Sequence, residues 1–308
     1  MTAAVLCIGA TLIDELHFCD QTIVPSSSNP AHKSTSIGGV VSNIAQHLTL
    51  LDVNVNCITA LGKDNDGIFI QQEFQKMKIG LNDSLIVDDA TGKYVSILHP
   101  DGNLFVAVCQ DISSKYITKS FLESKIESIK TAEWIIIDTN LNQDALQWII
   151  DFAKEHHQKL IIEPVSVPKA AKLAVLNLNG VYMITPNEEE LCVLSSQVAD
   201  NEAAHLQKLF ERGVSKIWLS KGNQGSVMHS DAKSHLVSVP CISIIDSSGA
   251  GDAAVAGWVY GMIHSKSEVS SIQFGHALAL QILQIKGTID YSITSEKLNL
   301  LKEKQYHD

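Results

Sequence analysis

The sequence predicts a layered α/β fold built on a mostly parallel sheet. Short apolar runs rich in β-branched residues alternate with helical patterns along the chain, and this alternation favours right-handed crossover connections. Several runs, such as Trp134–Ile137, are almost continuously apolar, as expected of parallel strands that are buried on both faces. No repeat, low-complexity segment or Pro/Gly-rich linker divides the chain, so we interpret residues 1–308 as a single domain.

Each expected strand is a short, mainly apolar run, and each expected helix is a longer stretch with helical spacing of its apolar residues. In chain order the expected strands are Val5–Gly9, Val53–Ala60, Trp134–Ile137, Leu160–Glu163, Val181–Ile184 and Ile217–Ser220. The expected helices are Val40–Leu51, Gly67–Met77, Gln143–His156, Glu188–Ser195 and Glu202–Arg212.

Two segments depart from this alternation. Asp14–Ile37 is polar and is predicted to be rich in loops after its start. Lys93–Gln110 is typical of a hairpin, because alternating runs flank the turn residues Pro100–Asn103. A hairpin does not belong in the main parallel sheet. We therefore expect these stretches, at about 15–37 and 93–110, to form a small β lid over one sheet edge.

The composition excludes several classes of function. The chain has 23 Lys and Arg against 34 Asp and Glu, a net charge of −11, so it lacks the basic surface that binds nucleic acid. Arg212 is the single arginine. If the protein handles phosphate, backbone amides, lysines or a metal must therefore replace guanidinium groups.

The N-terminus and the cysteines indicate a cytoplasmic protein. No basic residue precedes the first apolar stretch, which Asp14 and Glu15 end before it could span a membrane. The six cysteines are dispersed and form no C-x-x-C pair, which excludes zinc-ribbon and thioredoxin-like sites. We expect neither a nucleic-acid nor a membrane partner.

The strongest chemical signal is the segment Asp246–Asp252, which precedes a stretch of apolar helix. Its small residues Gly249, Ala250 and Gly251 leave consecutive amides free at a helix N-terminus, where amides and the helix dipole attract anions. Asp252 would lie beside this anion site and could accept a proton from a substrate hydroxyl. The segment therefore predicts a general base next to a charge-stabilising loop.

Two other interpretations of this segment stay open on spacing alone. The loop could be an ordinary glycine-rich turn with Asp252 as the N-cap of the helix. Gly249–Ala254 also matches the dinucleotide fingerprint G-x-G-x-x-A, which normally begins directly at a strand end, whereas Asp246–Ser248 intervene here. The sequence contains no P-loop motif.

At this point the chain resembles the ribokinase-type (PfkB) carbohydrate and nucleoside kinases over nearly its whole length. Five segments match motifs of that family in order: Gly9–Asp14, Ile37–Ala45, Thr185–Glu190, Ser220–Gly225 and Asp246–Asp252. The resemblance implies a three-layer α/β/α sandwich with a small β lid. It also implies a kinase that uses ATP, Mg²⁺ and a monovalent cation such as K⁺.

The resemblance assigns roles to residues within these segments. Substrate binding falls to Asp14, Gly38, Gly39 and Asn43. ATP binding falls to Asn187, Ser220, Lys221, Gly222, Gly225 and, on a later helix, His276. Glu190 would order Mg²⁺ through water, and the K⁺ loop would comprise Asp246, Ser248 and Gly287. Asp252 would take the proton, with the amides of Gly249, Ala250 and Gly251 around the developing charge.

Two segments narrow the range of candidate substrates. Ile162–Ala170 and Gly39–Leu48 resemble pseudouridine kinases more than ribokinases or fructokinases, and Lys169 is thereby implied in substrate binding. We expect phosphorylation of the 5′-hydroxyl of pseudouridine. Another nucleoside such as adenosine, a sugar such as ribose or fructose, and a non-catalytic metabolite-binding relative stay open. Members of the family often pair through the lid, but an exposed edge can equally be blunted within one chain, so the choice between a monomer and a homodimer through the lid stays open.

Overall fold

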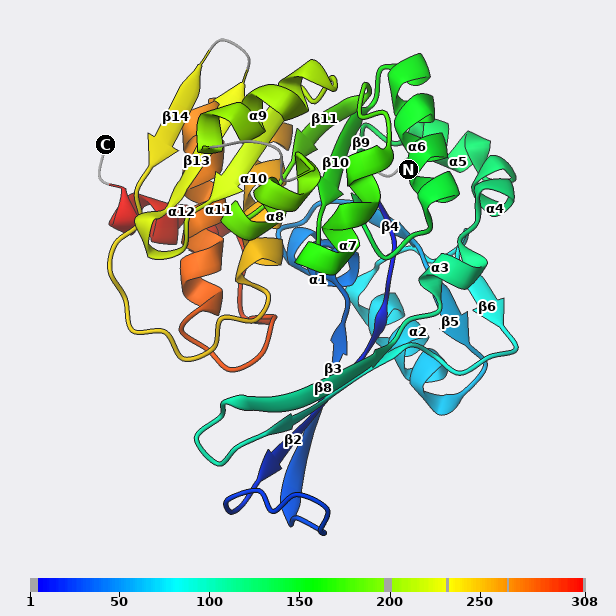
Figure 1. Ribbon diagram of the computed structural model, residues 1–308, viewed down its shortest axis with the longest axis vertical. Helices are drawn as coiled ribbons and strands as arrows, with labels where there is room; N and C mark the ends of the chain where they lie inside the picture. Colours follow the sequence, from blue (N-terminus) through cyan, green and yellow to red (C-terminus); the bar gives the residue numbers. More distant parts are fainter. Residues whose placement is uncertain (1–4, 197–200, 231–232, 265, 307–308) are drawn as a thin grey trace.

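The central sheet of the computed structural model has eight strands and is parallel except at one edge (Figure 1). The structure describes residues 5–196, 201–230, 233–264 and 266–306. Across the sheet the order is β14 (Ser234–Val237), β13 (Ser226–Ser230), β12 (Lys216–Ser220), β11 (Val181–Ile184), β10 (Lys159–Glu163), β9 (Trp134–Asp138), β1 (Val5–Ile8) and β4 (Val55–Ile58). The antiparallel pairings are those of β12 with β13 and of β13 with β14.

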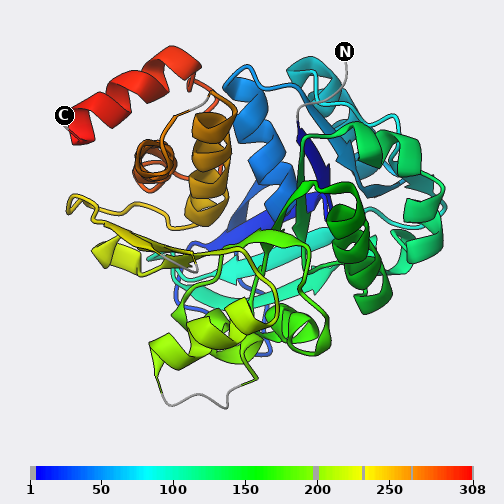
Figure 2. The same cartoon turned by 90° about the horizontal axis from the view of Figure 1, so that it is seen from above.

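Helices cover both faces of this sheet, which makes three layers (Figure 2). One face packs against α1 (Val40–Leu50), α2 (Asn65–Met77), α10 (Ala250–Ile263), α11 (Glu268–Ile282) and α12 (Ser295–Gln305). The other packs against α4 (Lys119–Glu123), α5 (Ile126–Thr131), α6 (Gln143–His156), α8 (Glu188–Leu194) and α9 (Glu202–Glu211). The predicted layered α/β fold is confirmed.

Strand β9 explains why its sequence is continuously apolar. Trp134 and Ile136 belong to one hydrophobic core and Ile135 and Ile137 to the other, and all four are fully buried. Successive side chains of a strand point to opposite faces, so a strand between two helical layers needs apolar residues at every position.

A second sheet, which we call the flap, projects from the main body (Figure 1). Its strand order is β3 (Ala31–Gly38), β2 (Leu12–Cys19), β7 (Lys93–Leu98) and β8 (Leu104–Gln110). Strand β2 pairs in parallel with β7 and antiparallel with β3. The ammonium of Lys93 lies 2.8 Å from the Asp66 carboxylate of α2 and thus ties the flap to the body.

The expectation of a loop-rich segment over Asp14–Ile37 was wrong in part. Most of it forms β2 and β3, each eight residues long. Five residues at the start of β3 are exposed. Because neither face of that part of the strand is buried, it shows no apolar–polar alternation, and the sequence signal for a strand is missing.

Two further elements differ from the sequence prediction. The single strand expected at Val53–Ala60 is divided into β4 and β5 (Ala60–Gly62), and β5 pairs with β6 (Leu85–Val87) in a separate sheet. The β13–β14 hairpin was not predicted, since its strands carry serines and histidines on a partly exposed edge. The apolar run that follows forms no strand and leaves Ile244 and Ile245 exposed.

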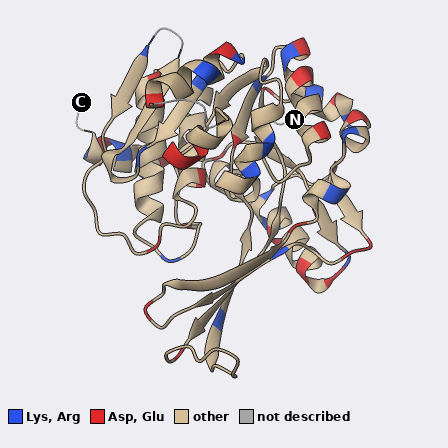
Figure 3. Ribbon diagram, viewed as in Figure 1, with Lys and Arg blue, Asp and Glu red and all other residues tan. Residues whose placement is uncertain are grey.

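Charged residues of both signs are interspersed along the helices (Figure 3). This distribution agrees with the absence of a basic footprint in the sequence. Across the residues that the structure describes, no helix combines the length and the apolar character needed to cross a bilayer.

Candidate active site

The candidate site lies at the edge of the sheet where the parallel strands end. Asp138 is the last residue of β9, Glu163 of β10 and Ser220 of β12. In open α/β sheets, ligands bind beyond this carboxyl edge. The N-terminal turn of α10 and the base of the flap lie at the same place, because Asp252 interacts electrostatically with both Asp138 and Asp14.

Helix α10 begins as the sequence predicts, at a turn of small residues. Gly249 is its N-cap and has a φ of 74°, in the left-handed region that favours glycine. Ala250 and Gly251 form the start of the helix, and a Cβ on Gly251 would meet nothing within 4 Å. The first amides of the helix therefore adjoin open space, where they can receive an anion.

Asp252 is the third residue of α10, and its side chain is not a helix cap. The N-cap interpretation of Asp252 is therefore wrong. The dinucleotide interpretation also fails, because a loop rather than a strand end precedes Gly249. The Asp252 side chain is buried instead, and its Oδ2 accepts a hydrogen bond of 2.8 Å from Nδ2 of Asn43 on α1.

Burial raises the pKa of Asp252 from 3.8 to about 7. The hydrogen bond from Asn43 opposes this effect, while the nearby carboxylates of Asp138 and Asp14 reinforce it. A carboxylate with a pKa close to neutral is matched to accepting a proton from an alcohol. This arrangement joins two motifs that lie 209 positions apart in the sequence.

Asp14, Gly38 and Gly39 form the junction between the flap and α1. Asp14 pairs with Ser36 and Tyr94 across the flap, and burial raises its pKa to about 6. A Cβ on Gly38 would lie 2.3 Å from the carboxylate of Asp14, so only glycine fits there. Gly39 is the N-cap of α1, with a φ of 99°. The structure thus brings Asp14 and Asn43 to the same side of the site as Asp252.

Lys169 lies on the short helix α7 (Val167–Ala170), which follows β10. Its ammonium donates to the side-chain carbonyl of Asn140, in the loop after β9. Lys172 caps the same loop by donating to the carbonyl oxygens of Thr139 and Leu141, each at 2.9 Å. Lys169 is therefore held in place by a neutral partner and is not part of a surface ion pair.

Asn187 and Glu190 form a reciprocal capping box at the start of α8. The Asn187 side chain accepts from the Glu190 amide at 2.9 Å, and the Glu190 carboxylate accepts from the Asn187 amide at 3.0 Å. Burial raises the pKa of Glu190. Only oxygen donors are presented here, which suits Mg²⁺. Within the described ranges, no group of three or more His, Cys, Asp or Glu side chains could hold a metal by itself.

Ser220 to Gly225 form a tight loop at the end of β12. The Lys221 amide donates to the Gly225 carbonyl at 2.9 Å, and Gly222 starts a single 3₁₀ turn. The Ser220 amide donates to Pro186 at 3.0 Å, which joins the loop to the Asn187 segment. The Lys221 ammonium pairs with the carboxylate of Glu202 at the start of α9.

His276 requires a correction. The sequence prediction placed it at the nucleotide, but its ring is 5% exposed within α11. Its Nε2 lies 2.7 Å from Oγ of Ser226 and its Nδ1 lies 2.9 Å from the hydroxyl of Tyr306. Burial lowers its pKa to about 4. Both ring nitrogens are thus used inside the protein, and neither is left to bind ATP.

The carboxylate of Asp246 contacts the other two residues that were predicted to bind the monovalent cation. Its Oδ1 accepts from the amide of Ser248 at 2.9 Å, and its Oδ2 accepts from the amide of Gly287 at 3.1 Å. The contact with Gly287 thus links the loop before α10 to the loop after α11. The sequence positions are 41 residues apart, so their meeting supports a common function.

The sequence prediction did not assign three residues that the structure adds to the site. Asp138 is fully buried and accepts from the amides of Ala10 and Asn140. Glu163 accepts from the Thr185 hydroxyl, and burial raises its pKa to about 8. Each is the last residue of a buried parallel strand, and that position is a signal in the sequence. The third, Thr288, carries no such signal.

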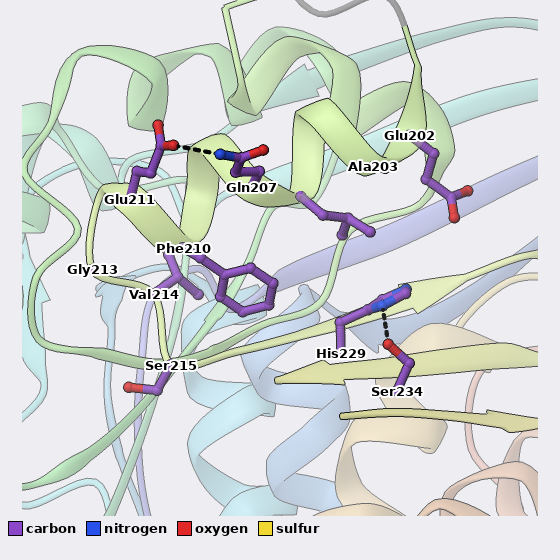
Figure 4. A pocket seen from close by; sticks show the side chains of 11 residues that line it. Glu202, Ala203, Gln207, Phe210, Glu211, Gly213, Val214, Ser215, His229 and Ser234 are labelled. Carbon is purple, nitrogen blue, oxygen red and sulfur yellow. Dashed lines mark hydrogen bonds between the residues drawn. The ribbon is translucent and has the colours of Figure 1, made fainter. Parts of the chain in front are cut away.

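A cavity of about 980 Å³ lies elsewhere, between α9 and the β13–β14 hairpin (Figure 4). Phe210 and Val214 line it on one side, and His229 and Ser234 line it on the other. It contains none of the predicted site residues. The site described above is therefore defined by its converging polar groups and not by this cavity.

The chain resembles known kinases in sequence and in fold. Residues 2–295 match the pfkB family of carbohydrate kinases. The pseudouridine kinase of Escherichia coli (strain K12) is 31% identical over 273 residues, which cover 85% of this chain and 86% of that protein.

Two solved structures share the fold at lower identity. A carbohydrate kinase from Agrobacterium tumefaciens has a TM-score of 0.86 at 23% identity and covers 98% of both chains. The Arabidopsis thaliana ribokinase complexed with ribose and ATP has a TM-score of 0.84 at 19% identity, covering 98% of this chain and 99% of that one. The ribokinase-like fold is thereby confirmed.

Proposed function

This chain belongs to the pfkB family of carbohydrate kinases, and we propose that it transfers the γ-phosphoryl group of ATP to the 5′-hydroxyl of pseudouridine. Family membership makes it a sugar or nucleoside kinase, a phosphotransferase with an alcohol acceptor. The acceptor and the residue roles below are our proposal.

The observation that carries the proposal is the environment of Asp252. This buried carboxylate lies in the first turn of α10, is held by Asn43 at 2.8 Å and has a pKa of about 7. We infer that Asp252 accepts the proton of the attacking hydroxyl. The hydroxyl oxygen then bonds to the γ-phosphorus, while the bond to the bridging oxygen breaks and ADP leaves with the electron pair.

Backbone groups take the place of the arginines that the chain lacks. The amides of Gly249, Ala250, Gly251 and Asp252 lie at a helix N-terminus and would stabilise the charge of the transferred phosphoryl group. Mg²⁺, when bound to the phosphates, neutralises part of their charge. Glu190 would hold it through water, with Asn187 nearby on the phosphate side, and Asp246, Ser248 and Gly287 would form the K⁺ loop.

Two features support pseudouridine as the acceptor. The E. coli relative named above is a pseudouridine kinase, and the segment around Lys169 resembles those enzymes. The Lys169–Asn140 pair offers hydrogen-bond donors from ammonium and amide groups, which suit the carbonyl oxygens of a uracil ring. Asp14 is suited to accept hydrogen bonds from the sugar hydroxyls. The retained Asp252 argues against a non-catalytic relative.

A coupled assay of ATP consumption tests the acceptor. Pseudouridine, uridine, adenosine, ribose and fructose are compared by kcat/KM, and we expect a preference of at least about 100-fold for pseudouridine. Lys169→Met should reduce the preference for pseudouridine over ribose. Turnover of free sugars alone would remove pseudouridine as the acceptor and leave the kinase class intact.

We also propose that the flap forms a homodimer. Strand β8 is the outer strand of the flap and exposes Leu104, Phe105, Val106 and Val108, with Val108 65% exposed. An apolar edge strand with unpaired backbone groups favours pairing with another chain. A second copy of the flap offers a complementary strand.

A further inference from the structure

Thr288 occupies the point where the predicted cation loop meets the predicted base. It follows Gly287, whose amide donates to Asp246 at 3.1 Å. Its side chain packs on the turn that starts α10, because a Cβ on Gly249 would lie 2.8 Å from the Cβ of Thr288. Its hydroxyl donates to Oδ1 of Asn43 at 3.4 Å.

The side-chain amide of Asn43 is thereby held at both ends. Its Nδ2 must face the Asp252 carboxylate, which can only accept a hydrogen bond when it is charged. Its Oδ1 then points to Thr288, the one hydroxyl donor that reaches it among the described residues. A rotation of the amide by half a turn would place Oδ1 against the carboxylate, which opposes that rotation. In the observed orientation, the hydrogen bond from the Thr288 hydroxyl anchors Oδ1.

We propose that Thr288 is a positioning residue that holds Asn43 in the orientation required by Asp252 and couples the Asp246–Gly287 contact to it. This inference rests on the proposed role of Asp252 as the base. The coupling runs through three consecutive contacts, from Asp246 to the Gly287 amide, from Thr288 to Asn43, and from Asn43 to Asp252.

The remaining titratable groups around Asp252 do not replace this contact. Asp138, Asp14 and Glu163 interact with the Asp252 charge unfavourably. His47, one turn beyond Asn43 on α1, is fully buried beside the Thr288 backbone, and its pKa is lowered to about 4, so it is neutral. Among these neighbours, Asn43 is the group that stabilises the charged form of Asp252.

Thr288→Val tests the inference, because valine keeps the shape and removes the hydroxyl. We expect kcat to fall about three- to tenfold with little change in the KM for ATP. The acidic limb of the kcat–pH profile should move to higher pH by about half a unit, since Asp252 loses part of the hydrogen bond that stabilises its charge. Thr288→Ser keeps the hydroxyl and should recover most of the lost activity and the original limb.

Matched variants separate the hydroxyl from packing and folding. Thr49→Val makes the same change on α1, where the Thr49 hydroxyl donates only to the Ala45 carbonyl, and should behave as wild type. If Thr288→Val does not fold, Thr288→Ala is measured in its place with the same expectation. Thermal unfolding is recorded for each variant.

The outcomes distinguish this inference from the proposed function. Wild-type kcat and an unmoved acidic limb in Thr288→Val overturn the coupling, and so does equal impairment of the Val and Ser variants. If Asp252→Asn keeps wild-type turnover, the base assignment fails and the coupling fails with it. Loss of activity in Asp252→Asn together with a normal Thr288→Val overturns the coupling alone.

Discussion

The side-chain amide of Asn43 donates a hydrogen bond of 2.8 Å to the carboxylate of Asp252, although 209 positions separate the two residues. Asn43 lies in the first turn of α1, just after Gly38 and Gly39, and Asp252 lies in the first turn of α10. Burial alone would favour the protonated acid, and the amide moves the balance toward the carboxylate. Two sequence motifs thus meet in one acid–base group.

Asp252→Asn should abolish turnover while ATP still binds. The substitution keeps the shape and removes the proton acceptor, so we expect kcat to fall by about 10²- to 10⁴-fold. ATP affinity, measured by calorimetry, should change less than about threefold. A turnover rate close to wild type would contradict the role of Asp252 as the base.

The activity should rise with pH through neutrality. Because the pKa of Asp252 is about 7, the carboxylate that accepts the proton forms as the pH passes that value. Asn43→Ala removes the hydrogen bond that favours the charged form and should move this limb to higher pH. The measurement is kcat against pH at saturating substrates. A limb that stays in place in the Asn43 variant would show that Asp252 does not govern it.

Glu163→Gln should stabilise the substrate-free protein at alkaline pH. Burial raises the pKa of Glu163 from 4.5 to about 8, so the folded protein holds a proton that the unfolded chain releases. Its stabilising contribution is present below pH 4.5 and is lost as the pH rises through 8. We expect similar thermal midpoints at pH 4.5 and a gain of about 3 °C for the variant at pH 8.5.

The control for this experiment is Glu155→Gln, on the exposed side of α6. It should show the same midpoint as wild type at both pH values. An equal midpoint for Glu163→Gln and wild type at pH 8.5 would mean that burial does not raise the pKa of Glu163.

Gly39→Ala should destabilise the fold, because the φ of Gly39 is 99° and a Cβ there would lie 2.3 Å from the Ala10 carbonyl oxygen. We expect a loss of about 2 kcal/mol or more in the free energy of unfolding. Gly251→Ala is the matched control, since a Cβ at Gly251 meets nothing within 4 Å and should cost less than about 0.5 kcal/mol. Chemical denaturation measures both, and equal losses would refute the steric argument.

Val108→Lys should convert the proposed homodimer into a monomer, because a charge on an edge strand opposes pairing. Light scattering after gel filtration measures the mass. Val175→Lys places the same charge at a site that is 76% exposed and lies outside the flap, and it should leave the dimer intact. A wild-type monomer, or a dimer that survives Val108→Lys, would exclude pairing through this edge.

The sequence predicted the strands with two buried faces most accurately. Runs such as Trp134–Ile137 and Val181–Ile184 are apolar because both helical layers contact them, so their composition reports their position. Strand β3 carries mostly exposed side chains and β14 lies on a partly exposed edge, and neither left a comparable pattern. Exposure alone does not decide the outcome, since strand β8 is mostly exposed and was still predicted, from the alternating runs that flank the turn residues Pro100–Asn103.

The sequence also predicted some residues of the candidate site better than others. Local motifs singled out Asp252, Asn187 and Asp246 as candidates, because a helix N-terminus, a capping box and a turn are built from neighbouring residues. His276 was misplaced, since nothing in its local sequence distinguishes a ring bonded to Ser226 and Tyr306 from one that faces a ligand.

The sequence by itself determined the layered fold, the loop of small residues before α10 and the need to hold phosphate with a single arginine. Tertiary structure alone decided which groups contact one another: Asn43 and Asp252, Thr288 and Asn43, and the Asp138 carboxylate and the amide of Ala10. The physical reason is that backbone conformation depends on near neighbours in the chain. Burial and charge at Asp252 depend instead on residues that the sheet brings together from distant strands.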